Sequence, residues 1–214
     1  MSRSPSFCGV ILSAGESTRM GRDKALLPWP PPLTEERSSR GDTFLSAAID
    51  SLLDFSDSVI VVSGKNEENL TPVVYAHNAS LVRNPAPERG QFSSLQVGLQ
   101  EVLNRGRDAA IVTLVDRPPV RRTTLAALHD AFVSAPANTW AVVPEYQARH
   151  GHPFVIGREL IEIFLKALPT ATAREIEHQN QSHILYLPVE DPFCVMNVDT
   201  PQDYAALQNN PAAR

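Results

Sequence analysis

The sequence predicts a three-layer α/β/α sandwich, in which a mostly parallel β-sheet lies between two layers of helices. Unbroken runs of Val, Ile and Leu recur along the chain, and such runs are typical of strands buried on both faces of a parallel sheet. Segments with the apolar spacing of amphipathic helices lie between these runs. Alternating strands and helices favour right-handed crossovers, with ligands bound at the carboxyl ends of the strands.

Four apolar runs are the predicted strands. Each stops at residues that end a strand, such as Gly15 after the first run and Pro144 after the fourth. The runs cover residues 7–12, 58–62, 109–115 and 140–143.

Five segments between or after these runs are predicted to be helical. Thr200 and Asp203 suit the first turn of the last helix, as a capping residue and an acid three positions on, with Pro201 between them. The other four are residues 44–53, a stripe formed by Leu95, Leu99, Val102 and Leu103, residues 123–133, and residues 159–168.

The chain has 214 residues, a length that suits one domain, which we place at residues 7–207. Residues 28–42 are rich in Pro, Ser and charge and are predicted to form an exposed loop inserted into that domain. Residues 208–214 are predicted to be a tail.

The composition argues against several classes of protein. A net charge of −5 does not suit a general nucleic-acid or membrane-surface binder, since such proteins normally carry a basic excess. The chain contains no apolar run long enough to span a membrane, and its first residues lack the apolar core of a signal peptide. Cys8 and Cys194 are expected to be small buried residues rather than redox or metal groups. We therefore expect a cytoplasmic protein.

The first motif with chemical content covers residues 12–24, directly after the first strand. Its small residues let the backbone approach a ligand, and their N–H groups can bind phosphate oxygens. Arg19 and Lys24 add positive charge that suits a triphosphate. The spacing is neither that of a P-loop nor G-x-G-x-x-G. By spacing alone, a tight turn with two solvated cations remains an alternative.

Two further motifs lie near the ends of other predicted elements. Asp116 follows a buried strand and precedes a proline turn, where a carboxylate can hold Mg²⁺ beside phosphates or can simply cap a turn. Asn84 can both donate and accept hydrogen bonds, as reading a base edge requires, and Ser93 and Ser94 open a helix. A capped loop is the alternative for that segment.

The segment Arg149-His150-Gly151-His152-Pro153 carries two histidines close together. Such a pair invites a zinc interpretation. No Cys or acid cluster completes a four-ligand set, which argues against structural zinc.

These motifs together resemble the molybdenum cofactor nucleotidyltransferases, in particular the molybdopterin cytidylyltransferases. The first motif is similar to the signature L-A-A-G-x-S-x-R-M-G-x-x-K-x-L-L-P, with Ser13 at the first Ala position. Asp116-Arg117-Pro118 resembles D-x-P, and residues 197–203 resemble D-I-D-T-P-E-D with Asn197 in place of an acid. Residues 84–95 and 149–153 resemble N-P-x-x-x-x-G-x-x-S-S-L and R-x-G-H-P. The resemblance spans residues 7–207.

The resemblance implies the Rossmann-like fold of nucleotide-diphospho-sugar transferases and a set of site residues. Asp116 and Asp199 would bind Mg²⁺, although a carboxylate in the position of Asp199 could also serve a helix start. His152 would contact the acceptor, and His150 would be its solvated neighbour. Arg19, Lys24 and Asp116 are the predicted catalytic residues. The predicted nucleotide-binding residues are Leu12, Ser13, Ala14, Gly15, Glu16, Ser17, Lys24, Asn84, Ser93 and Ser94.

The implied reaction joins a nucleoside monophosphate to the phosphate of the molybdenum cofactor and releases pyrophosphate. In the cofactor branch of the family, L-A-G-G goes with guanine and L-A-A-G with cytosine, so the resemblance implies CTP. Ala14 occupies the discriminating place, where its methyl group would crowd a purine more than Gly would. A molybdenum enzyme that receives the product is the expected protein partner. Two alternatives remain. One is a nucleotidyltransferase acting on a sugar or polyol phosphate, and the other is a catalytically idle carrier or chaperone that binds nucleotide or cofactor.

Overall fold

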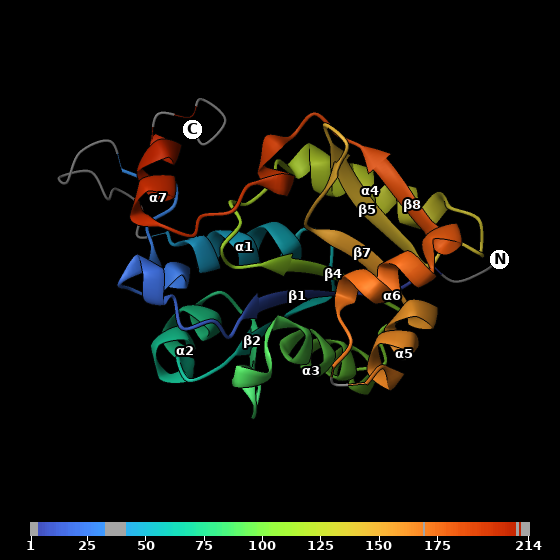
Figure 1. Ribbon diagram of the computed structural model, residues 1–214, viewed down its shortest axis with the longest axis horizontal. Helices are drawn as coiled ribbons and strands as arrows, with labels where there is room; N and C mark the ends of the chain where they lie inside the picture. Colours follow the sequence, from blue (N-terminus) through green and yellow to red (C-terminus); the bar gives the residue numbers. More distant parts are fainter. Residues whose placement is uncertain (1–3, 33–41, 169, 209, 211–214) are drawn as a thin grey trace.

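The computed structural model describes residues 4–32, 42–168, 170–208 and 210. Its strands form one eight-stranded sheet in the order β3-β2-β1-β4-β7-β5-β6, with β8 paired to the other edge of β5 (Figure 1). The strands are β1 (Phe7–Ser13), β2 (Ser58–Ser63), β3 (Ser80–Arg83), β4 (Ala109–Leu114), β5 (Ala141–Tyr146), β6 (Arg149–His150), β7 (Phe154–Gly157) and β8 (Ile184–Pro188).

Strand β1 is the centre of the parallel part of the sheet. It pairs in parallel with β2 on one side and β4 on the other, and every residue of β1 is buried. Strand β7 lies antiparallel between β4 and β5, and β8 runs parallel to β5. The carboxyl ends of β1 and β4 therefore meet at the same edge of the sheet.

Helices cover both faces of the sheet, and Figure 1 shows α1 and α4 on the side opposite α3 and α5. Cys8 and Val10 of β1 pack towards α3, α5 and α6, whereas Phe7 and Ile11 pack towards α1, α2, α4 and α7. The α-helices are α1 (Phe44–Leu53), α2 (Glu67–Ala76), α3 (Gln91–Asn104), α4 (Arg122–Ser134), α5 (Arg158–Lys166), α6 (Ala173–Gln179) and α7 (Pro201–Gln208). Short 3₁₀ turns are η1 (Thr18–Met20), η2 (Lys24–Leu26), η3 (Pro87–Arg89), η4 (Gln181–His183) and η5 (Pro192–Val195).

The predicted three-layer fold with a mostly parallel sheet is confirmed. The four predicted strands correspond to β1, β2, β4 and β5, and the predicted helices to α1, α3, α4, α5 and α7. The sequence did not reveal α2, α6, β3 or β6–β8. Helix α2 contains Pro72 in its interior, which obscures the helical pattern, and β6 is only two residues long.

The predicted exposed loop at residues 28–42 needs a correction where the structure describes it. Trp29 packs edge-on against Phe44 and Phe193, with ring centroids 5.0 and 6.0 Å away, and Pro31 is buried. The Tyr204 hydroxyl of α7 donates to the Pro28 carbonyl at 2.8 Å. The segment therefore begins as part of the core, because its aromatic residue fills space beside α1. Residues 33–41 lie outside the described part.

The predicted tail at residues 208–214 also needs a correction at its first residue. Gln208 ends α7, and its side-chain amide donates to the Pro32 carbonyl at 2.8 Å. Residues 209 and 211–214 of the predicted tail lie outside the described part.

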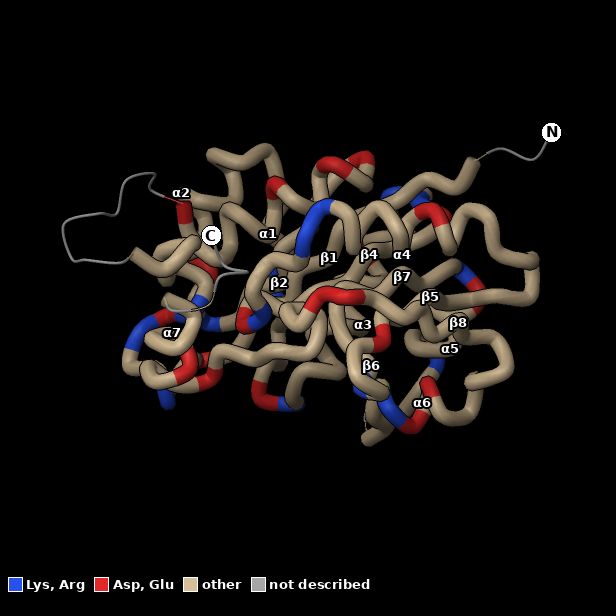
Figure 2. Tube along the Cα trace, turned by 90° about the horizontal axis from the view of Figure 1, so that it is seen from above, with Lys and Arg blue, Asp and Glu red and all other residues tan. Residues whose placement is uncertain are grey.

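Lys and Arg are interspersed with Asp and Glu along the described chain, as the blue and red segments of Figure 2 show. None of the described helices is long and apolar enough to cross a membrane. Cys8 and Cys194 are buried free thiols, and burial raises the pKa of both, that of Cys194 to about 11.

Candidate active site

A pocket of about 370 Å³ opens at the carboxyl ends of β1 and β4. We call it the nucleotide pocket, after the ligand that the sequence resemblance predicts for it. Its walls come from the loop after β1, the start of α3, the end of β4 and the segment before α7. The lining residues are Leu12, Ala14, Gly15, Ser17, Thr18, Arg19, Lys24, Pro87, Gly90, Gln91, Ser94, Leu114, Val115, Asp116 and Asp199.

The loop after β1 owes its shape to two residues with left-handed backbone conformations. Ser17 has φ 51° and Gly21 has φ 72°, and η1 lies between them. Gly tolerates this conformation without steric cost. The Ser17 hydroxyl also accepts a hydrogen bond from the Lys24 backbone N–H at 3.2 Å. The loop thus folds back on itself and carries Lys24 to the mouth of the pocket.

Asn66, which the sequence analysis missed, holds this loop from the side of β2. Its side-chain amide donates to the Ser13 carbonyl at 3.0 Å and to Asp23 Oδ2 at 2.7 Å, and it accepts from the Gly64 N–H at 3.1 Å. A Cβ on Gly64 would lie only 2.6 Å from the Ala14 carbonyl oxygen, so this position requires Gly. The sequence signal that could have indicated this turn is Ser63-Gly64, directly after the second predicted strand.

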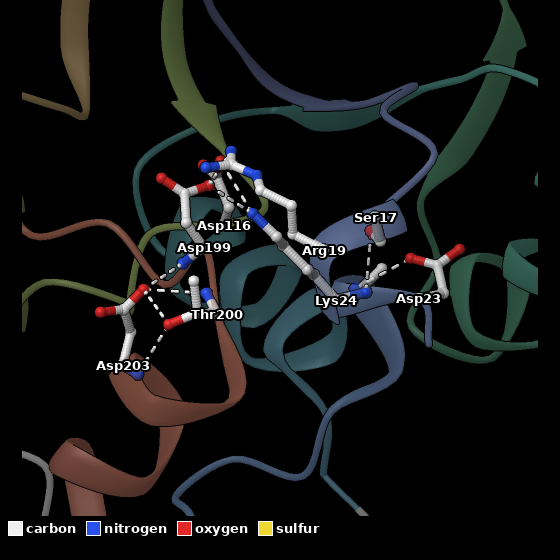
Figure 3. A network of polar contacts seen from close by, with 9 residues as sticks. Ser17, Arg19, Asp23, Lys24, Asp116, Asp199, Thr200 and Asp203 are labelled. Carbon is white, nitrogen blue, oxygen red and sulfur yellow. Dashed lines mark hydrogen bonds and ion pairs between the residues drawn. The ribbon is translucent and has the colours of Figure 1, made fainter. Parts of the chain in front are cut away.

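Two cations and two carboxylates converge at the edge of the nucleotide pocket (Figure 3). Lys24 Nζ lies 2.7 Å from Asp199 Oδ1 and 3.6 Å from Asp116 Oδ2, and the Lys24 side chain is only 11% exposed. Arg19 donates to the same Asp199 oxygen at 3.1 Å. The hydrogen bond from Lys24 and the charges of both cations hold the pKa of Asp199 below its usual range.

The C-terminal segment brings Asp199 to this place. The Val198 N–H donates to the Asp116 carbonyl at 2.8 Å, which ties the segment to the end of β4. Asp203 Oδ2 accepts hydrogen bonds from the backbone N–H groups of Asp199 and Thr200 and from the Thr200 hydroxyl. The predicted cap at the start of α7 therefore also fixes the backbone of Asp199. Asn197 is exposed and lies outside the lining of the nucleotide pocket.

The donor set suits a hard divalent cation. Asp116 Oδ1 is buried and has no hydrogen-bond partner among the described residues, although a carboxylate oxygen in such a place normally has one. Asp199 faces it across Lys24 Nζ, which contacts both carboxylates. Two carboxylates would leave the other positions of Mg²⁺ for water and phosphate oxygens, as is usual for this ion. The described residues contain no cluster of three or more His, Cys, Asp or Glu side chains suited to a metal.

The predicted base-reading residues Asn84, Ser93 and Ser94 form a hydrogen-bonded cluster at the start of α3. Asn84 is 1% exposed, and its side-chain amide donates to the hydroxyls of Ser93 and Ser94 at 2.9 Å each. Its side-chain oxygen accepts from the Ala86 N–H at 2.9 Å. Of these residues only Ser94 lines the pocket. The structure therefore uses Asn84 to fix the start of α3.

Two other predicted nucleotide-binding residues, Ser13 and Glu16, are not among the residues that line the nucleotide pocket. Ser13 is buried, and its hydroxyl has no hydrogen-bond partner in the described part of the chain. Glu16 is exposed and pairs with Lys65 at 2.6 Å.

A second, larger cavity of about 780 Å³ lies beside the first and shares Leu12, Gly90, Gln91 and Leu114 with it. We call it the acceptor pocket, because it contains His152, which the sequence resemblance predicts to contact the acceptor. It lies between the sheet and helices α3, α5 and α6, and most of its walls are apolar. Its other lining residues include Phe92, Val112, Ala141, Val143, Phe154, Ile156, Leu160, Phe164, Arg89, Arg174, His150, His152 and Glu177.

His152 lies in the wall of the acceptor pocket, apart from the four charges of the nucleotide pocket. A Cβ on the preceding Gly151 would lie 2.2 Å from the Cys194 carbonyl oxygen, so only Gly lets the two backbones pass this closely. The His152 N–H donates to that same oxygen at 2.8 Å. Burial of the ring, together with the charge of Arg117, lowers the pKa of His152 to about 3. The ring is therefore neutral, and its buried Nδ1 has no partner among the described residues.

The sequence model described as the MobA-like NTP transferase domain matches residues 9–184. The chain belongs to this family. The match includes the loop after β1, Asp116 and the segment around His152, and it ends before Asp199.

Two curated relatives are similar to nearly the whole chain. A probable molybdenum cofactor guanylyltransferase from Rhodopirellula baltica is 27% identical over 206 residues, which cover 93% of this chain and 90% of that protein. The molybdenum cofactor cytidylyltransferase of Escherichia coli is 23% identical over 197 residues, which cover 91% and 92%. The chain is therefore a nucleotidyltransferase, as the sequence predicts.

Solved structures agree with the fold. Rv0371c from Mycobacterium tuberculosis H37Rv superposes with a TM-score of 0.79 at 26% identity, covering 98% of this chain and 100% of that one. Molybdopterin-guanine dinucleotide biosynthesis protein A from Archaeoglobus fulgidus gives a TM-score of 0.66 at 15% identity, covering 94% and 97%. The second likeness concerns the fold alone.

Proposed function

We propose that this nucleotidyltransferase transfers CMP from CTP to the phosphate of a molybdopterin-type cofactor, with Mg²⁺ bound, and releases pyrophosphate. The observation that supports this most directly is the convergence of Arg19, Lys24, Asp116 and Asp199 in the nucleotide pocket, which shares part of its wall with the acceptor pocket. One pocket suits a nucleotide, and the other is large enough for a ring system that carries a phosphate. A molybdenum enzyme is the proposed recipient of the product.

The reaction needs charge neutralisation and alignment more than it needs a base. An acceptor phosphate oxygen forms a bond to the α-phosphorus of CTP while the bond from that phosphorus to the pyrophosphate oxygen breaks. Both reactants are anions, so Arg19 and Lys24 would offset the charge on the β- and γ-phosphates as they leave. Asp116 and Asp199 would hold Mg²⁺, and the ion would supply Lewis-acid neutralisation of the phosphate charge.

The acceptor would lie in the second pocket with its phosphate directed to Asp116. Arg89 and Arg174 line that pocket and form no ion pair within the described residues, so they are available to an anionic ligand. His152 would contact the acceptor as a neutral ring, able to donate from one nitrogen and accept at the other.

The choice of CTP depends on Ala14. This residue lines the nucleotide pocket, and its carbonyl lies close to Gly64, which limits how far the Ala14 backbone can move away from a base. A methyl group in that place leaves less room for a purine than Gly would. The guanylyl and cytidylyl relatives are similarly distant, and for this reason the base has to be measured.

The test is release of pyrophosphate from each of the four nucleoside triphosphates with Mg²⁺, with and without purified molybdopterin cofactor. Release from CTP only when the cofactor is present supports the proposal. A preference for GTP would contradict the role given to Ala14 but would not contradict the proposed acceptor. No release despite tight nucleotide binding would contradict the proposal, and a screen of sugar and polyol phosphates would then separate a different acceptor from an idle carrier.

A further inference from the structure

One carboxylate lies in the wall of the otherwise mainly apolar acceptor pocket. Glu177 of α6 is the one acidic residue among the described residues that line this cavity. Its side chain is 29% exposed. A carboxylate in such a place requires strong partners, because loss of hydration in an apolar site is costly.

Only one oxygen of Glu177 has protein partners. Oε1 lies 3.2 Å from His150 Nδ1 and accepts a hydrogen bond from the Tyr186 hydroxyl at 3.1 Å. Within the described residues Oε2 has no hydrogen-bond or ion-pair partner. The carboxylate is thus fixed through one oxygen and keeps the other for a ligand.

The two residues that contact Glu177, His150 and Tyr186, also contact each other. The His150 ring stacks on the Tyr186 ring with centroids 3.9 Å apart and an interplanar angle of 13°. On the other side of His150, Nε2 lies 3.5 Å from Glu145 Oε2. Burial and the charge of Glu177 raise the pKa of Tyr186 to about 12, so its hydroxyl remains a donor to Glu177 at neutral pH.

The rest of the pocket wall suits a flat ring. Phe92 and Phe164 lie with ring centroids 5.9 Å apart, and the side chains of Ile156 and Leu160 add apolar surface. A planar heterocycle can bury its faces against such walls, provided that its polar edge finds a partner.

We propose that Glu177 determines acceptor specificity by accepting hydrogen bonds from adjacent N–H donors on the edge of a planar heterocycle, as in a 2-amino-4-oxo pyrimidine ring. This inference rests on the proposed function for the identity of the acceptor. It adds the residue that distinguishes such a ring from a flat ring that lacks two adjacent N–H donors, which would leave the carboxylate without a matching pair of donors. His150 and Tyr186 act as positioning residues, because they act through Glu177.

The test compares two flat ligands that differ in one group. Pterin carries an amino group beside a ring N–H, whereas lumazine has a carbonyl in place of the amino group and so lacks the adjacent donors. Fluorescence titration of the full-length protein with each ligand needs neither nucleotide nor turnover. Because charge-assisted hydrogen bonds are strong, the wild-type protein should prefer pterin by roughly 10- to 100-fold.

Glu177→Gln keeps the side-chain shape and an oxygen that can accept from Tyr186, but it presents an N–H group to the donors of the ligand. The preference for pterin should disappear in this variant. Glu145→Gln is the matched control, since it removes the other carboxylate beside His150 and does not line the described pocket. It should keep the preference. Thermal unfolding of both variants checks that each is folded, and Glu177→Asp provides a second acidic variant.

Three outcomes would overturn the inference: no preference in the wild-type protein, a preference retained in Glu177→Gln, or an equal loss in both Gln variants, which would assign the effect to His150. Failure of the proposed function is visible separately as absence of nucleotide transfer to the molybdopterin cofactor. A wild-type protein that prefers pterin through Glu177 but transfers no nucleotide would support this inference and contradict the function.

Discussion

At the scale of single residues, Lys24 has two roles that compete for its one ammonium group. In the structure it neutralises Asp116 and Asp199, whereas the proposed reaction needs it on the phosphates. Lys24→Ala should lower turnover by about tenfold or more, because a buried cation beside the leaving group is lost. Steady-state rates at saturating CTP provide the measurement.

The matched control is Lys166→Ala, which removes an exposed partner of Glu162 on α5 and should leave turnover unaffected. A normal rate for Lys24→Ala would remove this residue from the mechanism.

His152 gives a prediction about pH and stability. Its pKa is about 3 in the folded protein and near 6.5 in an unfolded chain. Between these two pH values the imidazole is therefore protonated in the unfolded state and neutral in the folded state. The stabilisation that neutral His152 gives is complete above pH 6.5 and is lost as the pH falls towards 3. Urea unfolding should show that His152→Gln reduces the loss of stability between pH 7 and pH 5 by about 2 kcal/mol at most.

The matched control for this prediction is His178→Gln, which alters an exposed histidine on α6. It should follow the wild-type dependence on pH. An identical pH dependence in His152→Gln would mean that the imidazole takes up a proton readily in the folded state.

At the scale of elements, the loop after β1 depends on the turn that connects β2 to α2. Asn66 makes three hydrogen bonds across this junction, to Ser13, Asp23 and Gly64. Asn66→Ala should destabilise the protein by about 1–3 kcal/mol, because partly buried groups lose their partners. The same substitution should raise the KM for CTP, because the loop that carries Lys24 loses its hydrogen bonds to Asn66. Calorimetry and kinetics with Asn69→Ala, an exposed residue of α2, separate this effect from a general loss of stability of that helix.

The sequence predicted some of these elements well and others poorly, for physical reasons. Phe44–Leu53 shows a clear apolar face and matches α1 residue for residue. The strand β7 has only four residues and lies antiparallel in a parallel neighbourhood, so neither its length nor its pattern indicated its place beside β4. Long-range pairing of this kind follows from tertiary packing, which no local pattern records.

The same limit applies to the site. Arg19, Lys24, Asp116 and Asp199 could be predicted because each belongs to a short motif, and the structure places them within one network. Asn66 and Glu177 belong to no such motif, and only the fold shows that one supports a loop and the other lines a pocket. Asn84 could be recognised as important from its motif, but the partners of its side chain could not be predicted.

At the scale of the whole molecule, metal and nucleotide binding should be coupled. Without phosphates, Lys24 compensates the two carboxylates, and a cation would have to compete with it. Phosphates should attract Lys24 and release the carboxylates to the metal. The unfolding midpoint should therefore rise more with Mn²⁺ and CTP together than the sum of the two separate rises, because each ligand favours the state that binds the other. Additive shifts would contradict this coupling, and Lys24→Ala should abolish it while increasing the affinity for Mn²⁺ alone.

The distance along the chain between Lys24 and Asp199 also has a consequence for biosynthesis. These two residues are 175 positions apart, and every described strand precedes Asp199. During translation the first loop leaves the ribosome early, while its carboxylate partner does not yet exist. If Asp199 holds the metal as proposed, a nascent or prematurely terminated chain would contain Lys24 and Asp116 but could not complete the metal site.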